Sequence, residues 1–449
     1  MTSSAAPEAQ APQLDRQLGL ATATAAVAGE CIGVGIFLTP AGMAKSLGSP
    51  LWLLVVWLSI GLMTLCGALC YGELAARFTR PGGTYVYLYE AFGPRLAFLY
   101  GWMSLLVLDP GLTAALATGL SAYVAIVFPL SSLQARLLAV VVVAVLCIVN
   151  VLGTSLSGRI LRWSTWLKLA ILFFVVVFSF GMRLGSFSNF TPFVAQRPGS
   201  LPFFAGLAAA MVSAFFSFGG WWDVSKIAGE VRDPHINVPR AMIYGVLLVA
   251  GAYVLISFAF IYLVPIQNVA SDETFVAQAG AILLGRRGAV FFSSVVILCV
   301  LSSLAAMVMV FPRVYFAMAK DGLFFPSVGE AHPRLGTPYR AIAIQGIVAS
   351  ILILVGTFQQ IIAYFIFPAV LFLGLSVVGL FIVRRRAPNS SPYDTPGFPF
   401  VAYVFLAMVV VLLVLLGGHS PRQVALGMAV VLTGLPIYTL LFHRYASVR

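Results

Sequence analysis

Charged side chains are scarce in this sequence, and their scarcity limits what the protein can be. Only 9% of the 449 residues are charged, and only 14 are Asp or Glu. A water-soluble domain carries about 25% charged residues, so this chain lacks the charge to cover a soluble globule of its size. The four histidines and five cysteines show no metal-ligand spacing, and no nucleophile elbow or phosphate-binding loop occurs. We therefore expect no metal, no cofactor and no enzymatic activity.

Apolar residues fill most of the chain in long continuous runs, and 61% of the residues are hydrophobic. A helix of roughly 20 such residues crosses about 30 Å of hydrocarbon, whereas a membrane β-barrel would alternate apolar and polar residues. The pattern predicts an all-α integral membrane protein in a lipid bilayer. We expect twelve transmembrane helices, at residues 18–43, 50–77, 95–128, 135–153, 159–184, 203–229, 238–265, 288–318, 340–357, 361–384, 398–417 and 422–442.

Basic residues outnumber acidic ones and give a net charge of +12. In a soluble protein this excess would suggest nucleic acid, but in a membrane protein Lys and Arg collect in cytoplasmic loops. With the N-terminus inside, eighteen basic residues fall on the cytoplasmic side, Lys226 among them, and seven on the opposite side. We therefore predict no nucleic-acid partner and a multi-pass protein of the plasma (inner) membrane. Both terminal tails, 1–17 and 443–449, are expected in the cytoplasm.

Glycines interrupt two of the apolar runs at corresponding places. The first span contains Gly33 and Gly35, and the sixth contains Gly219 and Gly220. Glycine weakens a helix interior, and matched interruptions in two halves of a chain are typical of a transporter's binding site. A break exposes amides on one half-helix and carbonyls on the other, which can hold the carboxylate and ammonium of an α-amino acid. The alternative is that these glycines only allow close helix packing.

The residues around these glycines resemble those of a known family. Residues 33–37 read Gly-Val-Gly-Ile-Phe, and residues 216–221 read Phe-Ser-Phe-Gly-Gly-Trp. Residues 229–234 then read Gly-Glu-Val-Arg-Asp-Pro, and residues 237–239 read Asn-Val-Pro. Together these motifs resemble the amino acid–polyamine–organocation superfamily, and within it the L-type amino acid transporter branch. The resemblance covers nearly the whole chain.

The resemblance implies a LeuT-type fold, with discontinuous helices 1 and 6. Two inverted repeats of five spans each would occupy residues 18–184 and 203–384, and two extra helices would occupy 398–442. It also implies transport by alternating access. The leading hypothesis is a sodium-independent transporter or exchanger for small or medium neutral L-amino acids. An exchanger would be an antiporter.

The resemblance further assigns residues to the substrate. The carboxylate would meet amides near Val34, Gly35 and Ile36, and the ammonium would meet carbonyls of Cys31, Phe216 and Gly219. Phe218 or a neighbouring aromatic residue would close over the substrate as an outer gate. The remaining substrate-binding residues implied are Ile32, Gly33, Trp221 and Trp222.

The chain departs from the family pattern at three places. Val34 stands where relatives often have serine, so a hydroxyl for the carboxylate is missing. Trp222 stands where some relatives have asparagine or a smaller residue, which should reshape the side-chain pocket. The loop at 129–134 lacks the cysteine that links animal relatives to a glycoprotein partner. We therefore expect no disulfide-linked heavy-chain partner.

Four charged residues fall within the membrane, namely Glu30, Asp109, Lys168 and Asp223. Burying a charged side chain in lipid costs free energy, so such residues are taken as candidate functional sites. Lys168 matches a family lysine beside the first break, where sodium-coupled members bind sodium. It can couple transport to protons, or it can be a fixed structural cation on free carbonyls of helix one. Ser303 is a candidate contact for helix one.

The acids leave further alternatives open. Glu30 is expected to pair with Lys168 or to line the substrate cavity. Together with Asp109 and Asp223, it could attract a cationic substrate or carry a proton. This suggests a rival function, a cationic amino acid or polyamine carrier. Equally, each acid could face a water-filled vestibule and do neither. A transporter-like receptor would need a regulatory domain, and the tails are too short for one.

Overall fold

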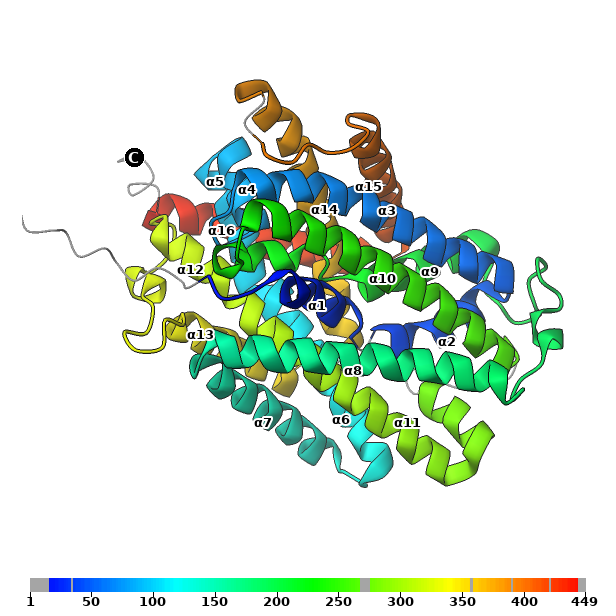
Figure 1. The fold of residues 1–449 in the computed structure, drawn as a ribbon. Helices are drawn as coiled ribbons and strands as arrows, with labels where there is room; N and C mark the ends of the chain where they lie inside the picture. The colour runs from blue at the N-terminus through cyan, green and yellow to red at the C-terminus, as the bar shows by residue number, and fades with distance from the viewer. Residues whose placement is uncertain are drawn as a thin grey trace, which may run out of the picture.

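The computed structural model describes residues 16–33, 35–266, 275–355, 358–388, 391–419 and 421–442. These residues form helices joined by loops, the longest of which link α8 to α9 and α12 to α13 (Figure 1), and the β-type pairing among them is one isolated bridge between Leu18 and Val231. The elements run α1 Leu20–Cys31, α2 Gly35–Leu47, α3 Pro50–Arg77, α4 Thr84–Phe92, α5 Pro94–Met103, η1 Ser104–Leu108, α6 Asp109–Val127, α7 Ser132–Val151, α8 Thr154–Gly181, η2 Phe187–Phe190, α9 Phe203–Phe218, η3 Asp223–Glu230, α10 Pro234–Leu263, α11 Phe275–Val310, α12 Pro312–Lys320, η5 Pro326–Gly329, α13 Tyr339–Val355, α14 Phe358–Arg386, α15 Phe400–His419, α16 Pro421–Ile437 and η6 Tyr438–Phe442.

Ten helical segments of the described chain are long and apolar enough to cross a membrane. They correspond to ten of the twelve spans expected from the sequence. The first expected span, 18–43, is divided by its break into α1 and α2, of 12 and 13 residues. The span expected at 340–357 contains α13, an apolar helix of 17 residues. Both segments are therefore helical and apolar, but each unbroken helix is short.

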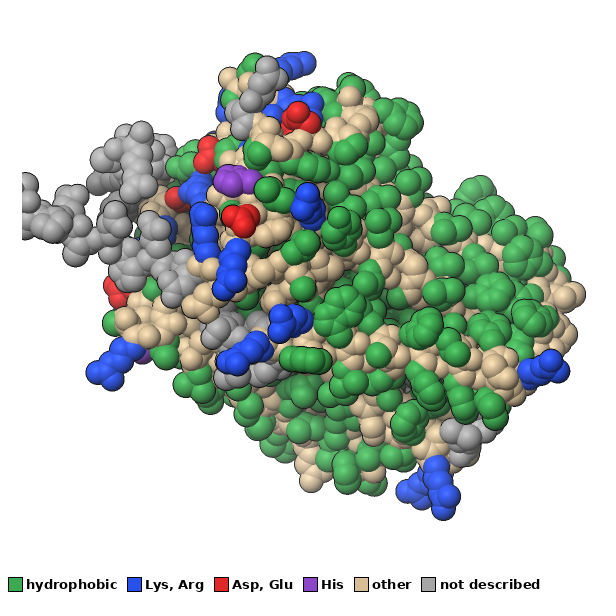
Figure 2. Space-filling view, viewed as in Figure 1, with side chains coloured by type: hydrophobic (Ala, Val, Ile, Leu, Met, Phe, Trp, Pro, Cys, Tyr) green, Lys and Arg blue, Asp and Glu red, His purple; other side chains and the backbone are tan. Residues whose placement is uncertain are grey.

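Apolar side chains cover the sides of the molecule, as a bilayer requires. In the span Gly285–Lys320, which contains most of α11 and all of α12, 72% is buried inside the protein, whereas in α7 only 17% is buried. The outer surface of α7 carries Leu137, Val141 and Ile148, all exposed. Figure 2 shows a broad hydrophobic surface over the middle of the molecule, with Lys and Arg gathered mainly at the left-hand end. The protein thus has an apolar belt and one strongly basic end.

Ion pairs hold helices together at this basic end. Arg80 donates to both oxygens of Asp321 at 2.8 and 3.0 Å, and to Glu90 at 3.1 Å. Tyr85 also donates to Asp321, at 3.0 Å. Burial, with the Asp321 carboxylate beside it, raises the pKa of Tyr85 well above its ordinary value, so the phenol keeps its proton. These contacts tie the loop after α3 and α4 to the end of α12.

A wider helical turn precedes Asp109 in the third span. Pro110 has no N–H, and its ring would clash with the carbonyl one turn earlier. The chain accommodates it with the π-helical turn η1, after which α6 continues to Val127. Asp109 stands at the junction, fully buried. The proline therefore sets the place at which this acid enters the core.

Candidate functional site

The first break lies between α1 and α2, which end and begin at Cys31 and Gly35. Ile32 and Gly33 are not helical, and the Gly33 amide donates to the Cys31 carbonyl at 2.7 Å. The first amides of α2 have no carbonyl one turn earlier in that helix, so they can serve as donors to an anion. Val34 lies outside the described residues.

The second break lies between α9 and η3. α9 ends at Phe218, and the chain turns through Gly219 and Gly220 before η3 begins at Asp223. Gly220 has a φ of +101°, a left-handed conformation that L side chains rarely adopt. A Cβ there would also lie 2.8 Å from the Cβ of Glu30. Both backbone conformation and space therefore require glycine at 220, and the predicted interruption of the sixth span is confirmed.

The two breaks pack directly against each other. A Cβ on Gly35 would lie 2.8 Å from the Cα of Ser217, so α2 approaches the backbone of α9 closely. The Cys31 thiol donates to the Phe218 carbonyl at 3.2 Å. The Tyr253 hydroxyl of α10 lies 2.5 Å from the Cys31 carbonyl oxygen and 2.7 Å from that of Ser217. The glycine-rich segments of two distant spans thus form one centre made largely of backbone.

This packing occupies carbonyls that the resemblance assigned to a substrate ammonium. The Cys31 oxygen accepts from the Gly33 amide and from the Tyr253 hydroxyl. The Phe216 oxygen accepts from the Gly219 amide at 3.0 Å. A carbonyl oxygen has two lone pairs, so both are used at Cys31 whenever Tyr253 donates to it and not to Ser217. A ligand ammonium at Cys31 would have to replace one of the two donors.

Aromatic rings of the second break are buried against neighbouring helices. Phe218 packs against Trp57 of α3, with ring centroids 6.1 Å apart. Trp221 meets Tyr71 of α3 edge to face at 5.1 Å, and Trp222 lies 5.5 Å from Trp221. These contacts fix the turn between α9 and η3. Phe218 is an anchor in this conformation, and its role as an outer gate stays a prediction.

Lys168 of α8 lies beside the first break, where its ammonium meets backbone oxygens. It donates to the carbonyls of Gly29 and Ile32 at 2.8 and 2.9 Å, and to the Ser303 hydroxyl of α11 at 3.0 Å. Ser303 itself lies 2.6 Å from the Gly29 oxygen. All three hydrogens of the ammonium are therefore used. The expected pair between Lys168 and Glu30 does not form, because the carbonyls of helix one take these hydrogens.

Asp109 and Asp223 share a buried lysine. The Nζ of Lys226 lies 2.9 Å from Asp109 Oδ1 and 2.8 Å from Asp223 Oδ1, and none of the three side chains is more than 1% exposed. Ser104 donates to Asp109 Oδ2 at 2.6 Å, and the Tyr315 hydroxyl lies 3.4 Å from the same atom. The network joins α6, η3 and α12. A lysine between two carboxylates offsets part of the free energy needed to bury them.

Sequence comparison identifies the family. A sequence model of amino acid permeases matches residues 18–442, almost the whole chain. This protein belongs to the amino acid permease family. The permease is similar to known transporters over nearly their full lengths, and none of those compared below is an enzyme.

Three of these relatives show the range of substrates. The serine/threonine exchanger SteT of Bacillus subtilis (strain 168) is 29% identical over 438 residues, covering 97% of the permease and 98% of the relative. The human cystine/glutamate transporter is 28% identical, covering 95% of the permease and 85% of the relative. The human b(0,+)-type amino acid transporter 1 is 29% identical, covering 91% and 84%. The permease is therefore an amino acid transporter of the multi-pass membrane class.

Sequence reasoning placed one residue of this centre wrongly and missed others. Lys226, at the end of the expected sixth span, is assigned by its charge to the cytoplasmic side, but it is fully buried, because Asp109 and Asp223 pair with it in the interior. The spacing of Asp223 and Lys226, three residues apart, was the signal that could have indicated a pair. Ser217 and Tyr253 were missed because each acts through contacts with distant backbone, which no local motif indicates.

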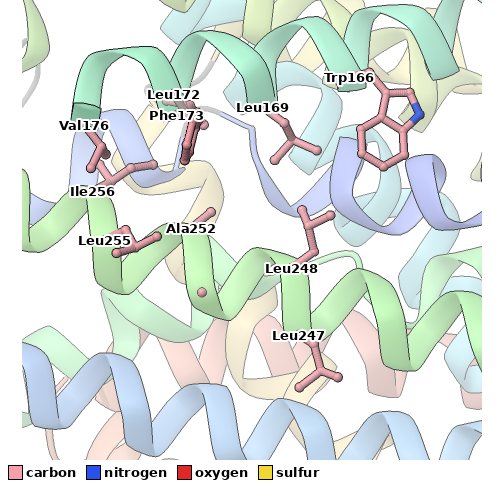
Figure 3. Close-up of a pocket in the computed structure, with 11 residues that line it drawn as sticks. Trp166, Leu169, Leu172, Phe173, Val176, Leu247, Leu248, Ala252, Leu255 and Ile256 are labelled. Atoms are coloured by element: carbon pink, nitrogen blue, oxygen red, sulfur yellow. The ribbon is translucent and has the colours of Figure 1, made fainter. Parts of the chain in front are cut away.

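An apolar groove on the permease is separate from this centre. It lies between α8 and α10, has a volume of about 340 Å³, and is lined by residues such as Trp166, Leu172 and Ile256 (Figure 3). Its lining side chains are apolar throughout. The charged groups of an amino acid would lose hydration there without gaining a partner, so the groove is unsuited to the substrate.

Proposed function

We propose that this permease moves small or medium neutral L-amino acids across the plasma membrane without sodium, by exchange or uptake through alternating access. The contact between the two interrupted helices carries the proposal, because it places the first amides of α2 beside the end of α9. A free α-amino acid carries the carboxylate and ammonium that two such breaks can hold. The relatives support the class, since SteT is a serine/threonine exchanger.

In this proposal the substrate lies across the two breaks. Its carboxylate accepts from the amides near Val34, Gly35 and Ile36, which begin α2. Its ammonium donates to carbonyls of Phe216, Gly219 or Cys31. At Cys31 it would replace the Tyr253 hydroxyl as donor. The rings of Phe218, Trp221 and Trp222 would then limit the space for the substrate side chain.

The proposed architecture is a LeuT-type arrangement of twelve helices, in which α1 with α2 and α9 with η3 are the discontinuous helices 1 and 6. The repeats are 18–184 and 203–384, followed by the helices of 398–442. The basic end is the cytoplasmic side, and both tails lie there. Because the loop 129–134 contains no cysteine, no disulfide-linked partner is proposed.

Two buried charge arrangements support sodium independence and neutral substrates. The Lys168 ammonium lies on the carbonyls of Gly29 and Ile32, a position that supports a fixed cation in place of sodium. Asp109 and Asp223 pair with Lys226, so these acids are partly neutralised within the protein instead of being reserved for a cationic substrate.

Counterflow in proteoliposomes tests the proposal. Vesicles loaded with unlabelled amino acids receive labelled alanine, leucine, arginine or putrescine outside, in sodium-free buffer. We expect exchange of alanine or leucine, and a strong loss in the variant Gly219→Val, which fills the second break. A Cβ at 219 has its nearest neighbour at 3.0 Å, the Phe216 oxygen, so the change acts mainly on the break. Exchange of none of the four compounds above empty vesicles would refute the function.

A further inference from the structure

Glu30 is a buried acid without a hydrogen-bond donor. It lies in the last turn of α1, is 2% exposed, and touches the position of Gly220 in the second break. Within the described residues, neither of its carboxylate oxygens has a hydrogen-bond partner. A buried ionised carboxylate without partners is very unfavourable. The surroundings therefore favour a neutral, protonated side chain.

Asp223 lies beside Glu30 and is only partly satisfied within the described residues. Both acids adjoin Gly220: the Glu30 Oε2 atom lies 3.2 Å from the place of a Cβ on Gly220, and the Asp223 amide donates to the Gly220 carbonyl at 3.0 Å. Lys226 contacts Asp223 at 2.8 Å as an ion pair, yet among the described residues neither Asp223 oxygen accepts a well-directed hydrogen bond. Two ionised carboxylates offer only acceptors to each other. One proton between them would supply the missing donor and remove one negative charge.

Asp109, the third acid of this region, provides the contrast. It accepts hydrogen bonds from Ser104 and Lys226 at 2.6 and 2.9 Å, so it is stabilised as a carboxylate. Lys168 is bonded to backbone and Ser303 and cannot serve Glu30. Asp109 and Asp223 therefore share one ammonium, and Glu30 has none within the described residues. Five titratable groups of the described residues interact with Glu30 or Asp223, namely Asp109, Lys168, Lys226, Cys31 and Tyr100, and behind them Tyr253 contacts Cys31 and Tyr315 contacts Asp109.

We propose that Glu30 and Asp223 hold one proton between them and form a proton-binding site of the transport cycle. The inference rests on the proposed transport function and names a second ligand for it. One carboxyl group belongs to α1 and the other to η3, so each interrupted helix contributes half of the site. When the two half-helices separate and water enters, the shared contact is lost and the proton can leave. Binding of the proton and closure of the breaks then favour each other.

Infrared spectroscopy of the purified protein tests the site without transport. The wild type should show the carbonyl stretch of a protonated carboxylic acid in a buried site, shifted in heavy water, at neutral pH. Glu30→Gln should remove this band, because glutamine keeps the shape of the neutral acid and an amide that can donate to Asp223. Glu330→Gln, the same change at an exposed ion pair, should keep it. A wild type without the band, or a band retained in Glu30→Gln, overturns the proposal.

Transport tests its use. In proteoliposomes with an imposed pH gradient, a pH-sensitive dye inside should report proton movement with substrate in the wild type. Glu30→Gln should lower exchange several-fold and abolish both proton movement and the pH dependence of uptake. Amino acid exchange without proton movement in the wild type would overturn the coupling while leaving the transport function intact. Selective loss of arginine exchange in Glu30→Gln would instead assign Glu30 to a cationic substrate and also overturn the proposal.

Discussion

Lys168 and Lys226 are both fully buried, yet different acceptors hold them. Lys168 bonds to two carbonyls and a hydroxyl, whereas Lys226 pairs with two carboxylates. The first arrangement leaves a net positive charge at the first break, and the second leaves a net negative one beside the second break. The two lysines therefore give opposite electrostatic character to neighbouring parts of the centre.

Removing Lys168 should damage transport, because the carbonyls of Gly29 and Ile32 and the hydroxyl of Ser303 would lose three charge-assisted hydrogen bonds. Each such bond contributes about 1.5–3 kcal/mol, so we expect Lys168→Ala to lower exchange by roughly tenfold or more. Lys320→Ala, at an exposed lysine of α12, should change it little. Uptake and pH profile equal to those of the wild type would remove Lys168 from the mechanism.

Gly35 is the residue where the two breaks come closest. A methyl group there would meet the Ser217 backbone at 2.8 Å, which forces α2 away from α9. We expect Gly35→Ala to abolish most counterflow and to lower thermal stability by several degrees. The matched control is Gly251→Ala on α10, where a Cβ meets nothing within 4 Å. Equal activity of the two variants would show that the close approach is not needed.

At the scale of elements, η3 is fastened to α12. Arg313 of α12 donates to Glu230 at 2.7 Å, and both side chains are 1% exposed. The second half of the interrupted helix can therefore move as one piece with α12. The backbone of Leu18 provides a second connection to this segment. Its amide donates to the Glu230 carbonyl at 2.9 Å, and its carbonyl accepts from the Arg232 amide at 2.8 Å.

Breaking this pair should destabilise the fold. Arg313→Met leaves Glu230 as a buried charge without its partner, and such changes cost roughly 3–5 kcal/mol. We expect a marked drop in the melting temperature in detergent. Glu230→Gln combined with Arg313→Met removes both charges and should recover part of the loss. A double variant no more stable than Arg313→Met would contradict the importance of the ion pair.

The helix breaks could be predicted from sequence, but their contacts could not. Glycine content located both interruptions to within a few residues, because glycine weakens a helix wherever it lies. For Lys168 the sequence leaves two partners open, Glu30 and the free carbonyls of helix one, and the structure shows it bonded to two of these carbonyls. The carbonyls that compete for the ammonium exist only once the helix is broken. Lys226 falls inside the expected sixth span, but a basic residue near a span end suggests the cytoplasmic surface, and its two carboxylate partners, Asp109 and Asp223, hold it in the interior instead.

For the whole molecule, the basic end predicts how the protein is oriented in the membrane, with that end in the cytoplasm. Ser132 begins α7 and Ser327 lies in η5, and both are exposed. With both tails in the cytoplasm, Ser132→Cys should react with an impermeant maleimide added to intact cells, and Ser327→Cys should react only after lysis. The wild type measures the background from its own cysteines, four of which are buried. Reversed labelling would invert the proposed topology.

Tyr253 brings the two breaks together with a single hydrogen. Its hydroxyl stands between the carbonyls of Cys31 and Ser217 and can donate to only one of them at a time. Rotation about the C–O bond of the ring would move this hydrogen from one carbonyl to the other. A single side chain of α10 thus offers one donor to two interrupted helices, and the carbonyl that it leaves is free to accept from another group.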